Sequence, residues 1–273
     1  MPAAPGSAAS AALRVTEIFH SIQGESSRVG LPTVFVRLTG CPLRCTWCDT
    51  AYAFSGGELL ATEEILQRVA AFGCATVCVT GGEPLAQKAC LPLLAALCDA
   101  GHAVSLETSG ALDIGAVDPR VARIVDLKAP GSGEAAKNRW ENIDLLTQHD
   151  ELKFVLASRE DYDWAIAACR QHRLFARCPV LFSPVQGQLD PAQLAQWILA
   201  DRLPLRFQLQ LHKVLWGNAP QRLGTPSRPP PPSGGGDRSP ARRRAMHGNK
   251  PTASTVGRVA AWPKSRAYSR RHS

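Results

Sequence analysis

The chain has 273 residues, of which 45% are hydrophobic and 20% are charged, so it is long and apolar enough to fold around a buried core. This composition excludes a fibrous or wholly disordered protein, and no apolar run approaches the roughly 20 residues that cross a bilayer. The nine cysteines are odd in number and unevenly spaced, which argues against a secreted disulfide framework. We therefore expect a cytoplasmic protein with reduced thiols and no membrane partner.

The formal net charge of +8 belongs to the C-terminal tail. Residues 221–273 hold 12 of the 31 Lys and Arg residues but one of the 23 Asp and Glu residues, a net charge of +11 that leaves the rest of the chain at −3. The tail contains SRPPPPSGGGDRSPARRR and shows no apolar period, so we expect it to be disordered. The expected organisation is a flexible N-terminus over 1–14, a core domain over 15–220 and the basic tail over 221–273.

Short apolar runs alternate with helical patterns along the core domain. The predicted strands are Thr33–Thr39, Ala75–Thr80, Ala103–Glu107, Arg123–Lys128, Leu152–Leu156, Pro179–Ser183 and Leu205–Leu211. The predicted helices follow Thr62, which we expect to be the N-cap of the first, and lie near 86–100, 160–172 and 190–200. This alternation predicts an α/β fold with a mainly parallel sheet, open or partly closed into a barrel. In either form, chemistry gathers at the carboxyl ends of the strands.

Three cysteines follow the first predicted strand in a C-x3-C-x2-C pattern, Cys41, Cys45 and Cys48. Their thiolates can hold three corners of one metal centre. A structural zinc ion would need a fourth nearby Cys or His, whereas the other six cysteines lie in or beside predicted strands and helices and are expected to be small buried hydrophobes. A four-iron cluster held by three cysteines leaves one iron open to a ligand that is not protein, which favours catalysis. The zinc site remains as an alternative.

The cysteine triplet resembles the signature of the radical S-adenosylmethionine (SAM) enzymes. The resemblance implies a partial (β/α) barrel in which Cys41, Cys45 and Cys48 hold a [4Fe-4S] cluster, the open iron chelates SAM, and electron transfer cleaves SAM to a 5′-deoxyadenosyl radical. It also implies a flavodoxin-like electron donor. Thr80-Gly81-Gly82-Glu83-Pro84 resembles the GGEP element of these enzymes, which approaches the SAM amino group. The SAM-binding residues implied by the resemblance are Trp47, Cys48, Asp49, Gly82, Ser109, Lys128, Ser132, Ser183, Pro184, Val185 and Gln186.

Within that superfamily, residues 15 to about 220 resemble the 7-carboxy-7-deazaguanine synthase family. The resemblance rests on the segment Phe19-His20-Ser21-Ile22-Gln23-Gly24-Glu25, on Arg37, on Cys48-Asp49-Thr50 and on Gln210-Leu211-His212-Lys213. It implies a lyase of queuosine and 7-deazapurine biosynthesis that converts 6-carboxy-5,6,7,8-tetrahydropterin to 7-carboxy-7-deazaguanine and releases ammonia. It further implies a homodimer, a Mg2+ ion held by Thr50, and substrate contacts from Ile22, Gln23, Gly24, Arg37 and Thr80.

Reasoning from the residues leaves several of these roles open. Alternation along Thr33–Thr39 places Arg37 on the face opposite three apolar residues, where a guanidinium needs an anionic partner. That partner is either a substrate carboxylate or a salt bridge to Glu25 or Asp49. Thr50 either binds Mg2+ or caps a helix. His212 either contacts substrate or packs at a strand end.

Two other functions share part of these features. A glycyl-radical activating enzyme carries the same cysteine triplet, but it gives no reason for Gln23 and Arg37. An iron–sulfur or zinc RNA-binding protein could use the basic tail, but Trp262 and Tyr268 are its only aromatic residues for stacking on bases. Nucleic-acid binding is therefore not expected.

Overall fold

The computed structural model describes residues 12–217, which form an open sheet of nine strands in the order β3-β1-β2-β4-β5-β6-β7-β8-β9. Every neighbouring pair from β2 to β9 is parallel, and β1 pairs antiparallel with both β2 and β3. The predicted α/β fold with a mainly parallel sheet is confirmed. The expected tail lies outside the described residues.

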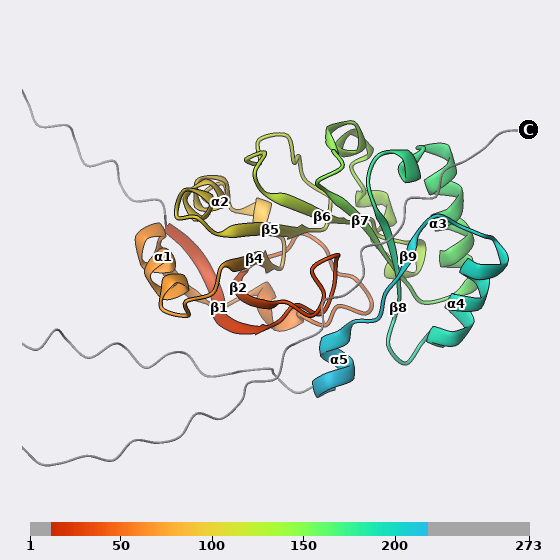
Figure 1. The fold of residues 1–273 in the computed structure, drawn as a ribbon, viewed down its shortest axis with the longest axis horizontal. Coiled ribbons are helices and arrows are strands. Elements are labelled where there is room, and N and C mark those ends of the chain that lie inside the picture. The colour runs from red at the N-terminus through yellow and green to blue at the C-terminus, as the bar shows by residue number, and fades with distance from the viewer. Residues whose placement is uncertain (1–11, 218–273) are drawn as a thin grey trace, which may run out of the picture. The chain divides into compact units, whose positions relative to one another are not determined.

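The strands are β1 Ala12–Ile22, β2 Pro32–Leu38, β3 Glu58–Ala61, β4 Thr76–Gly81, β5 Ala103–Thr108, β6 Ala122–Asp126, β7 Glu151–Leu156, β8 Val180–Pro184 and β9 Arg206–Phe207. The α-helices are α1 Thr62–Ala70, α2 Cys90–Asp99, α3 Arg159–Gln171, α4 Pro191–Ala200 and α5 Leu211–Trp216. Short 3-10 helices lie at Ala51–Phe54, Pro84–Ala86, Pro130–Ser132, Ala135–Lys137, Trp140–Leu145 and Leu174–Ala176. Figure 1 shows α1 and α2 beside the N-terminal half of the sheet and α3 and α4 beside its C-terminal half.

Helices α1 to α4 pack against the apolar face of the sheet, and its other face carries polar residues. In β2, Val34, Val36 and Leu38 are fully buried in the core, whereas Arg37 lies on the opposite face. Parallel strands joined by crossover helices bring their carboxyl ends to one edge of the sheet. No helix within residues 12–217 is long and apolar enough to span a membrane.

Side-chain caps begin two of the helices. The Ser158 hydroxyl accepts a hydrogen bond from the Asp161 amide at the start of α3, and the Asp190 carboxylate accepts one from the Ala192 amide at the start of α4. The predicted N-cap role of Thr62 is wrong, because α1 begins at Thr62 and its capping position is Ala61.

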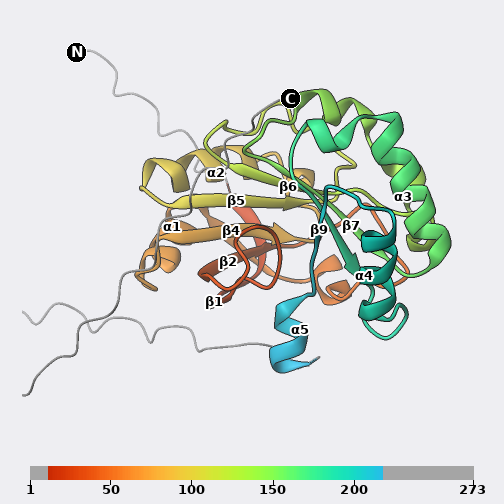
Figure 2. The same cartoon turned by 45° about the vertical axis from the view of Figure 1, so that its right-hand side comes forward.

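Two segments differ from the sequence-based expectation. Strand β1 begins at Ala12 and buries Leu13 completely, so residues 12–14 are not part of a flexible N-terminus. The strand expected over 205–211 is confined to Arg206–Phe207. The Gln208 amide still donates to the Phe182 carbonyl of β8, while its side chain bonds to the backbone of Ser26 through both its amide nitrogen and its oxygen. The chain then turns into α5, which follows β9 (Figure 2).

A buried ion pair fixes the start of β7 against β6. Both oxygens of the Asp150 carboxylate are within 3.0 Å of donors on Arg123, and Oδ2 also accepts from the amide and hydroxyl of Thr147. Burial raises the pKa of Asp150, but these donors outweigh it and hold the pKa below its usual value.

We expect Asp150→Asn to lower the free energy of unfolding at pH 7 by about 2 kcal/mol, the scale of hydrogen bonds to a charged group. Because the folded pKa is depressed, the ionised carboxylate stabilises the native state above its unfolded pKa of about 3.9, and this stabilisation is lost as the pH falls below that value. Urea unfolding of both proteins should therefore show a difference that stays constant from pH 7 to about 5 and shrinks as the pH is lowered below about 4. A difference that does not change with pH would contradict this account.

Candidate functional site

Five polar side chains lie on adjacent strands, at the carboxyl ends of β2, β4, β5 and β6 and in the middle of β7. We call Arg37, Thr80, Glu107, Asp126 and Lys153 the polar row. Arg37 is the register partner of Thr80, and Asp126 is the register partner of Lys153. The Thr80 hydroxyl donates to Glu107 Oε2 over 3.0 Å. The sheet therefore collects cationic and anionic groups from strands far apart in the sequence.

The loop with the three cysteines follows β2 and packs against two other strand-end loops. The Thr46 amide donates to the Ser132 carbonyl over 3.0 Å, and the Thr46 hydroxyl donates to the Gly131 carbonyl over 2.9 Å. On the other side, the Glu83 amide donates to the Gly40 carbonyl over 2.8 Å. These bonds hold the cysteine loop beside the ends of β4 and β6.

The donor set of this loop fits a thiolate-bound cluster. Cys41, Cys45 and Cys48 are half-buried and form no disulfide. Within residues 12–217 no three His, Cys, Asp or Glu side chains converge on one point as ligands of a single metal ion. Ligands of a four-iron cluster do not converge in that way, because each thiolate binds a different iron. The other six cysteines are fully buried, or half-buried at Cys74 and Cys98.

Gly82 lets the GGEP turn approach the cysteine loop. A Cβ atom at Gly82 would lie 2.1 Å from the Gly40 carbonyl oxygen and 2.9 Å from the Cβ of Cys41, so a larger residue would push the two loops apart. The following residue, Glu83, is fully buried and links this turn to the end of β5. Its carboxylate accepts hydrogen bonds from the Leu85 amide, from the Thr108 hydroxyl and from both the amide and the hydroxyl of Ser109.

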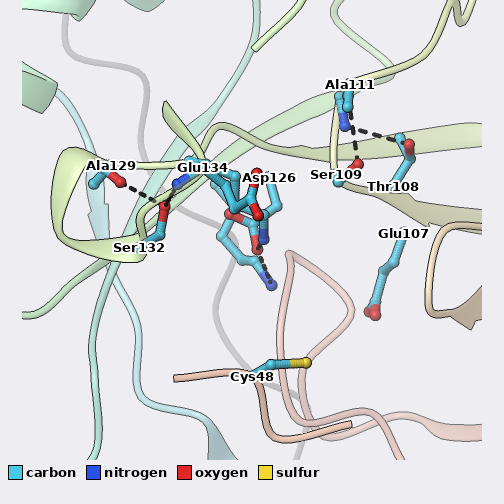
Figure 3. A network of polar contacts seen from close by, with 12 residues as sticks. Cys48, Glu107, Thr108, Ser109, Ala111, Asp126, Ala129, Ser132 and Glu134 are labelled. Atoms are coloured by element: carbon cyan, nitrogen blue, oxygen red, sulfur yellow. Dashed lines mark hydrogen bonds and ion pairs between the residues drawn. The ribbon is translucent and has the colours of Figure 1, made fainter. Parts of the chain in front are cut away.

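Lys128 brings a positive charge to the cysteine side of the site. Its ammonium lies 3.0 Å from Asp126 Oδ2, and its backbone amide donates to Asn138 over 2.8 Å. Burial raises the pKa of the Cys41 and Cys45 thiols, and Lys128 acts in the opposite direction on both. Figure 3 shows Cys48, Asp126 and Glu107 in one close view, with Ser132 to one side of them.

The loop after β1 carries Gln23, Gly24 and Glu25 into the site. The Gln23 amide nitrogen donates to Glu107 Oε1 over 3.2 Å, so Gln23 and Thr80 converge on one carboxylate. Glu25 forms an ion pair with Lys153 and accepts from the Gln210 amide over 2.6 Å. Burial works against the charge of Glu25, but these partners lower its pKa to about 2.

Arg37 has a different protein partner from those expected. Its Nε donates to Glu17 Oε1 on β1 over 2.8 Å, whereas Glu25 pairs with Lys153 and Asp49 pairs with Lys213. The expected alternative of a salt bridge from Arg37 to Glu25 or Asp49 is therefore wrong. Within residues 12–217 the two terminal nitrogens of the Arg37 guanidinium have no hydrogen-bond partner, so they can bind an anion.

The segment around α5 closes against the same loops. The Leu211 amide donates to the Gly24 carbonyl over 2.9 Å, and a Cβ atom at Gly24 would lie 2.1 Å from His212 Nδ1. Lys213 forms an ion pair with Asp49 over 2.8 Å. Burial lowers the pKa of His212, although the Glu25 and Asp49 carboxylates oppose the shift. His212 therefore lies at the site, packed on Gly24.

The residues expected to bind SAM lie on several strand ends. Ser109 follows β5, and its hydroxyl is bonded to Glu83. The Ser132 hydroxyl donates to the Ala129 carbonyl over 2.6 Å. Ser183 and Pro184 end β8 and are buried with Val185, whereas Gln186 is exposed. The Ser183 hydroxyl is buried and has no hydrogen-bond partner among the described residues, as expected of a side chain that awaits a ligand.

Sequence reasoning missed three members of the polar row, Glu107, Asp126 and Lys153. Each ends or lies within a strand that was predicted correctly as a β-strand. The signal in the sequence is a charged residue in an otherwise apolar strand, the same signal that singles out Arg37. Asp126 Oδ1 is buried without a hydrogen-bond partner in residues 12–217, which marks it as part of the same site.

Comparison with known proteins agrees with this arrangement. A family model described as the Radical SAM superfamily matches residues 35–174. The chain is 49% identical over 209 residues to the 7-carboxy-7-deazaguanine synthase of Chlorobaculum tepidum, which covers 76% of this chain and 95% of that one. It is 43% identical over 221 residues to the enzyme of the same name from Koribacter versatilis, which covers 75% of this chain and 97% of that one.

A solved structure shares the fold. The crystal structure of QueE from Escherichia coli aligns with a TM-score of 0.62 at 22% identity and covers 74% of this chain and 95% of that chain. The relatives favour the lyase over the glycyl-radical activating enzyme, the zinc site and the RNA-binding alternative, and the superfamily implies a [4Fe-4S] cluster and SAM as cofactors. The chain thus belongs to the 7-carboxy-7-deazaguanine synthase family of radical SAM enzymes.

Proposed function

We propose that this chain converts 6-carboxy-5,6,7,8-tetrahydropterin to 7-carboxy-7-deazaguanine and releases ammonia, as a lyase of queuosine and 7-deazapurine biosynthesis. The observation that carries the proposal is the convergence of Gln23 and Thr80 on Glu107, with Arg37 adjacent in the polar row. This group combines a cation for a carboxylate with a carboxylate for ring N–H groups. Both lie on the same sheet edge as the cysteine loop.

Cys41, Cys45 and Cys48 would hold the cluster, and Lys128 would offset part of its negative charge. When bound, the cluster and SAM supply radical chemistry that removes a hydrogen atom from the substrate. Gly82 keeps the backbone after β4 close to the cysteine loop, where the SAM amino group would bind. The remaining proposed SAM contacts are Trp47, Asp49, Ser109, Ser132, Ser183, Pro184, Val185 and Gln186.

On the substrate side, the terminal nitrogens of Arg37 would pair with the pterin carboxylate. Glu107 would accept hydrogen bonds from ring N–H groups, because its two protein partners are neutral donors and a carboxylate has about four acceptor sites. Ile22, Gln23, Gly24 and Thr80 would line the same space, as expected from the sequence. Holding the substrate in one orientation is the main contribution of these residues to the rate.

We also assign a Mg2+ ion to Thr50. Thr50 occupies the capping position of the 3-10 helix Ala51–Phe54, but its side chain makes no capping hydrogen bond. Its hydroxyl lies 3.7 Å from the Cys48 sulfur, beside the cluster loop. A hydroxyl left unused by the helix supports the metal role over the capping alternative, since Mg2+ takes oxygen ligands and keeps several waters or substrate oxygens.

Three further assignments complete the proposal. A flavodoxin-like protein would donate the electron that the cluster needs, and the enzyme would act as a homodimer, as the family resemblance implies. We place it in the cytoplasm, because all nine cysteines are free thiols and a reducing compartment keeps them so.

An anaerobic assay tests the function directly. Protein with a reconstituted and reduced cluster, incubated with SAM, Mg2+ and 6-carboxytetrahydropterin, should form 7-carboxy-7-deazaguanine, followed by mass spectrometry. Omitting Mg2+ should slow the reaction if Thr50 holds the ion. Cleavage of SAM without this product would contradict the substrate, and a protein that binds zinc and does neither would contradict the reaction class.

Replacing any cysteine of the triplet should remove the cluster. We expect Cys41→Ala, Cys45→Ala and Cys48→Ala to lose the iron–sulfur absorption and all SAM cleavage, because three thiolates are the whole protein ligand set. Cys74→Ala is the matched control, since its thiol hydrogen-bonds to the carbonyls of Pro32 and Thr76 and packs against the apolar core, away from the cysteine loop. Iron content and SAM cleavage equal to wild type in a triplet variant would refute the ligand assignment.

Removing the substrate charges should separate substrate binding from SAM chemistry. We expect Arg37→Met and Glu107→Gln each to lower kcat/KM for the pterin by about 100-fold, the scale of a lost charged contact of 2–3 kcal/mol. SAM cleavage without pterin should stay near wild type. Arg177→Met is the control, because its ion pair with Asp144 is exposed and distant in the sheet order from β2. Equal losses in both reactions would show that these residues do not act on the substrate.

A further inference from the structure

A buried lysine without an assigned role stands in the middle of the site. Lys153 lies on β7 and is 8% exposed. Its ammonium pairs with Glu25, which lies in the loop over residues 23–31 that we call the substrate loop, and lies 3.4 Å from Asp126 Oδ2. Burial opposes the charge, yet the two carboxylates outweigh it and raise the pKa of Lys153 well above its usual value. The side chain is therefore a permanent buried cation.

On one side, Lys153 contacts the loop after β1 through Glu25. Glu25 uses one carboxylate oxygen for Lys153 and the other for Gln210. The Glu25 amide donates to Gln23 Oε1 over 3.2 Å, and Gln23 in turn reaches Glu107. The ammonium is thus linked through two residues to the carboxylate that we propose for substrate binding.

The same strand anchors the loop at a second point. The amide of Ser27 donates to both oxygens of Glu151, which lies two residues before Lys153 and therefore on the same face of β7. Backbone bonds between Gln23 and both Gly30 and Leu31 close the base of the loop. The loop over residues 23–31 accordingly crosses the open face of the sheet and is held there by charged residues of β7.

On its other side, Lys153 contacts the cysteine half of the site. Asp126 Oδ2 is shared between Lys153 and Lys128, the residue two positions further along the chain, just past the end of β6. Figure 3 shows Asp126 in the same close view as Cys48 and Glu107. Lys153 therefore contacts both the substrate loop and the strand end beside the cysteine loop.

We propose that Lys153 is a positioning residue that holds the substrate loop over residues 23–31 in a fixed position relative to the cysteine loop. This inference rests on the proposed function. The ammonium holds Glu25 at a set distance from Asp126, so that Gln23 stays on Glu107. Without the ammonium, Glu25 is a buried carboxylate that has lost its cation and must turn outward or take up a proton. Either change shifts Gln23, and a shift of about 1 Å at a reacting centre can cost about 100-fold in rate.

The test compares Lys153→Met with Arg123→Met in the reconstituted enzyme. Arg123 forms a buried ion pair with Asp150 near the opposite ends of β6 and β7, so its loss costs stability without touching the loop. We expect Lys153→Met to lower kcat/KM for the pterin by about 100-fold, to raise KM, and to cleave more SAM for each product formed. SAM cleavage without pterin should fall less than product formation does, because the proposed role of Lys153 is on the substrate loop. Lys153→Arg should restore part of the coupling.

A readout that needs no activity accompanies the kinetics. Hydrogen–deuterium exchange of the full chain should show faster exchange at residues 23–31 and 208–213 in Lys153→Met, and not in Arg123→Met. Unchanged exchange in these segments would overturn the proposal. So would equal losses of product formation and SAM cleavage in both variants, because that is the result of general destabilisation.

Two outcomes require a further variant or measurement. If Lys153→Met fails to fold, Glu25→Gln and Lys153→Arg carry the same test, because Glu25→Gln keeps the shape but removes the carboxylate charge, and unchanged coupling and exchange in both would overturn the proposal. If the wild-type enzyme cleaves SAM but makes no deazaguanine, the proposed function fails while the exchange experiment still decides the role of Lys153.

Discussion

The register of the parallel strands is the constraint on which the site depends. Arg37 stands opposite Thr80 in the pairing of β2 with β4, and Asp126 stands opposite Lys153 in the pairing of β6 with β7. A slip of one residue in either pair would turn these side chains into the apolar core, which is fully buried at Val36 and Val79. Burial of the apolar face therefore fixes the strand register, and the register in turn fixes where the polar side chains of the site lie.

The loops that follow the strands carry the remaining side chains of the site. The cysteine loop is fixed on one side by the Gly40 carbonyl and on the other by Ser132, while Glu83 ties the ends of β4 and β5 together. A fully buried carboxylate such as Glu83 is tolerated because every bond it receives comes from a hydroxyl or an amide. The contacts around the proposed cluster are thus formed by the protein alone, which leaves the thiols and the Ser183 hydroxyl for ligands.

The sequence predicted the fold and the cysteine loop because both follow from local patterns. Alternation in β2 and the spacing of Cys41, Cys45 and Cys48 need no knowledge of distant contacts. Glu107 and Lys153 were missed because their roles depend on partners more than 80 residues away, at Gln23 and at Glu25. The expected strand over 205–211 also depends on distant partners: it bonds to β8 only as far as Gln208, whose amide donates to the Phe182 carbonyl, and Leu211 then donates to Gly24 instead. Long-range hydrogen bonds overrode local preference at these points.

The charges of the polar row also bear on the kind of ligand that fits it. Glu25 and Asp126 are compensated by the ammonium groups of Lys153 and Lys128, so they can stay ionised without a ligand. Glu107 is different, because its hydrogen-bond donors are the neutral groups of Gln23 and Thr80, which leaves acceptor capacity on a half-buried carboxylate. Arg37 keeps two terminal nitrogens for an anion in the same row. A ligand that satisfies both must carry N–H donors and a carboxylate a short distance apart, which a carboxylated pterin ring does and a simple aliphatic acid does not.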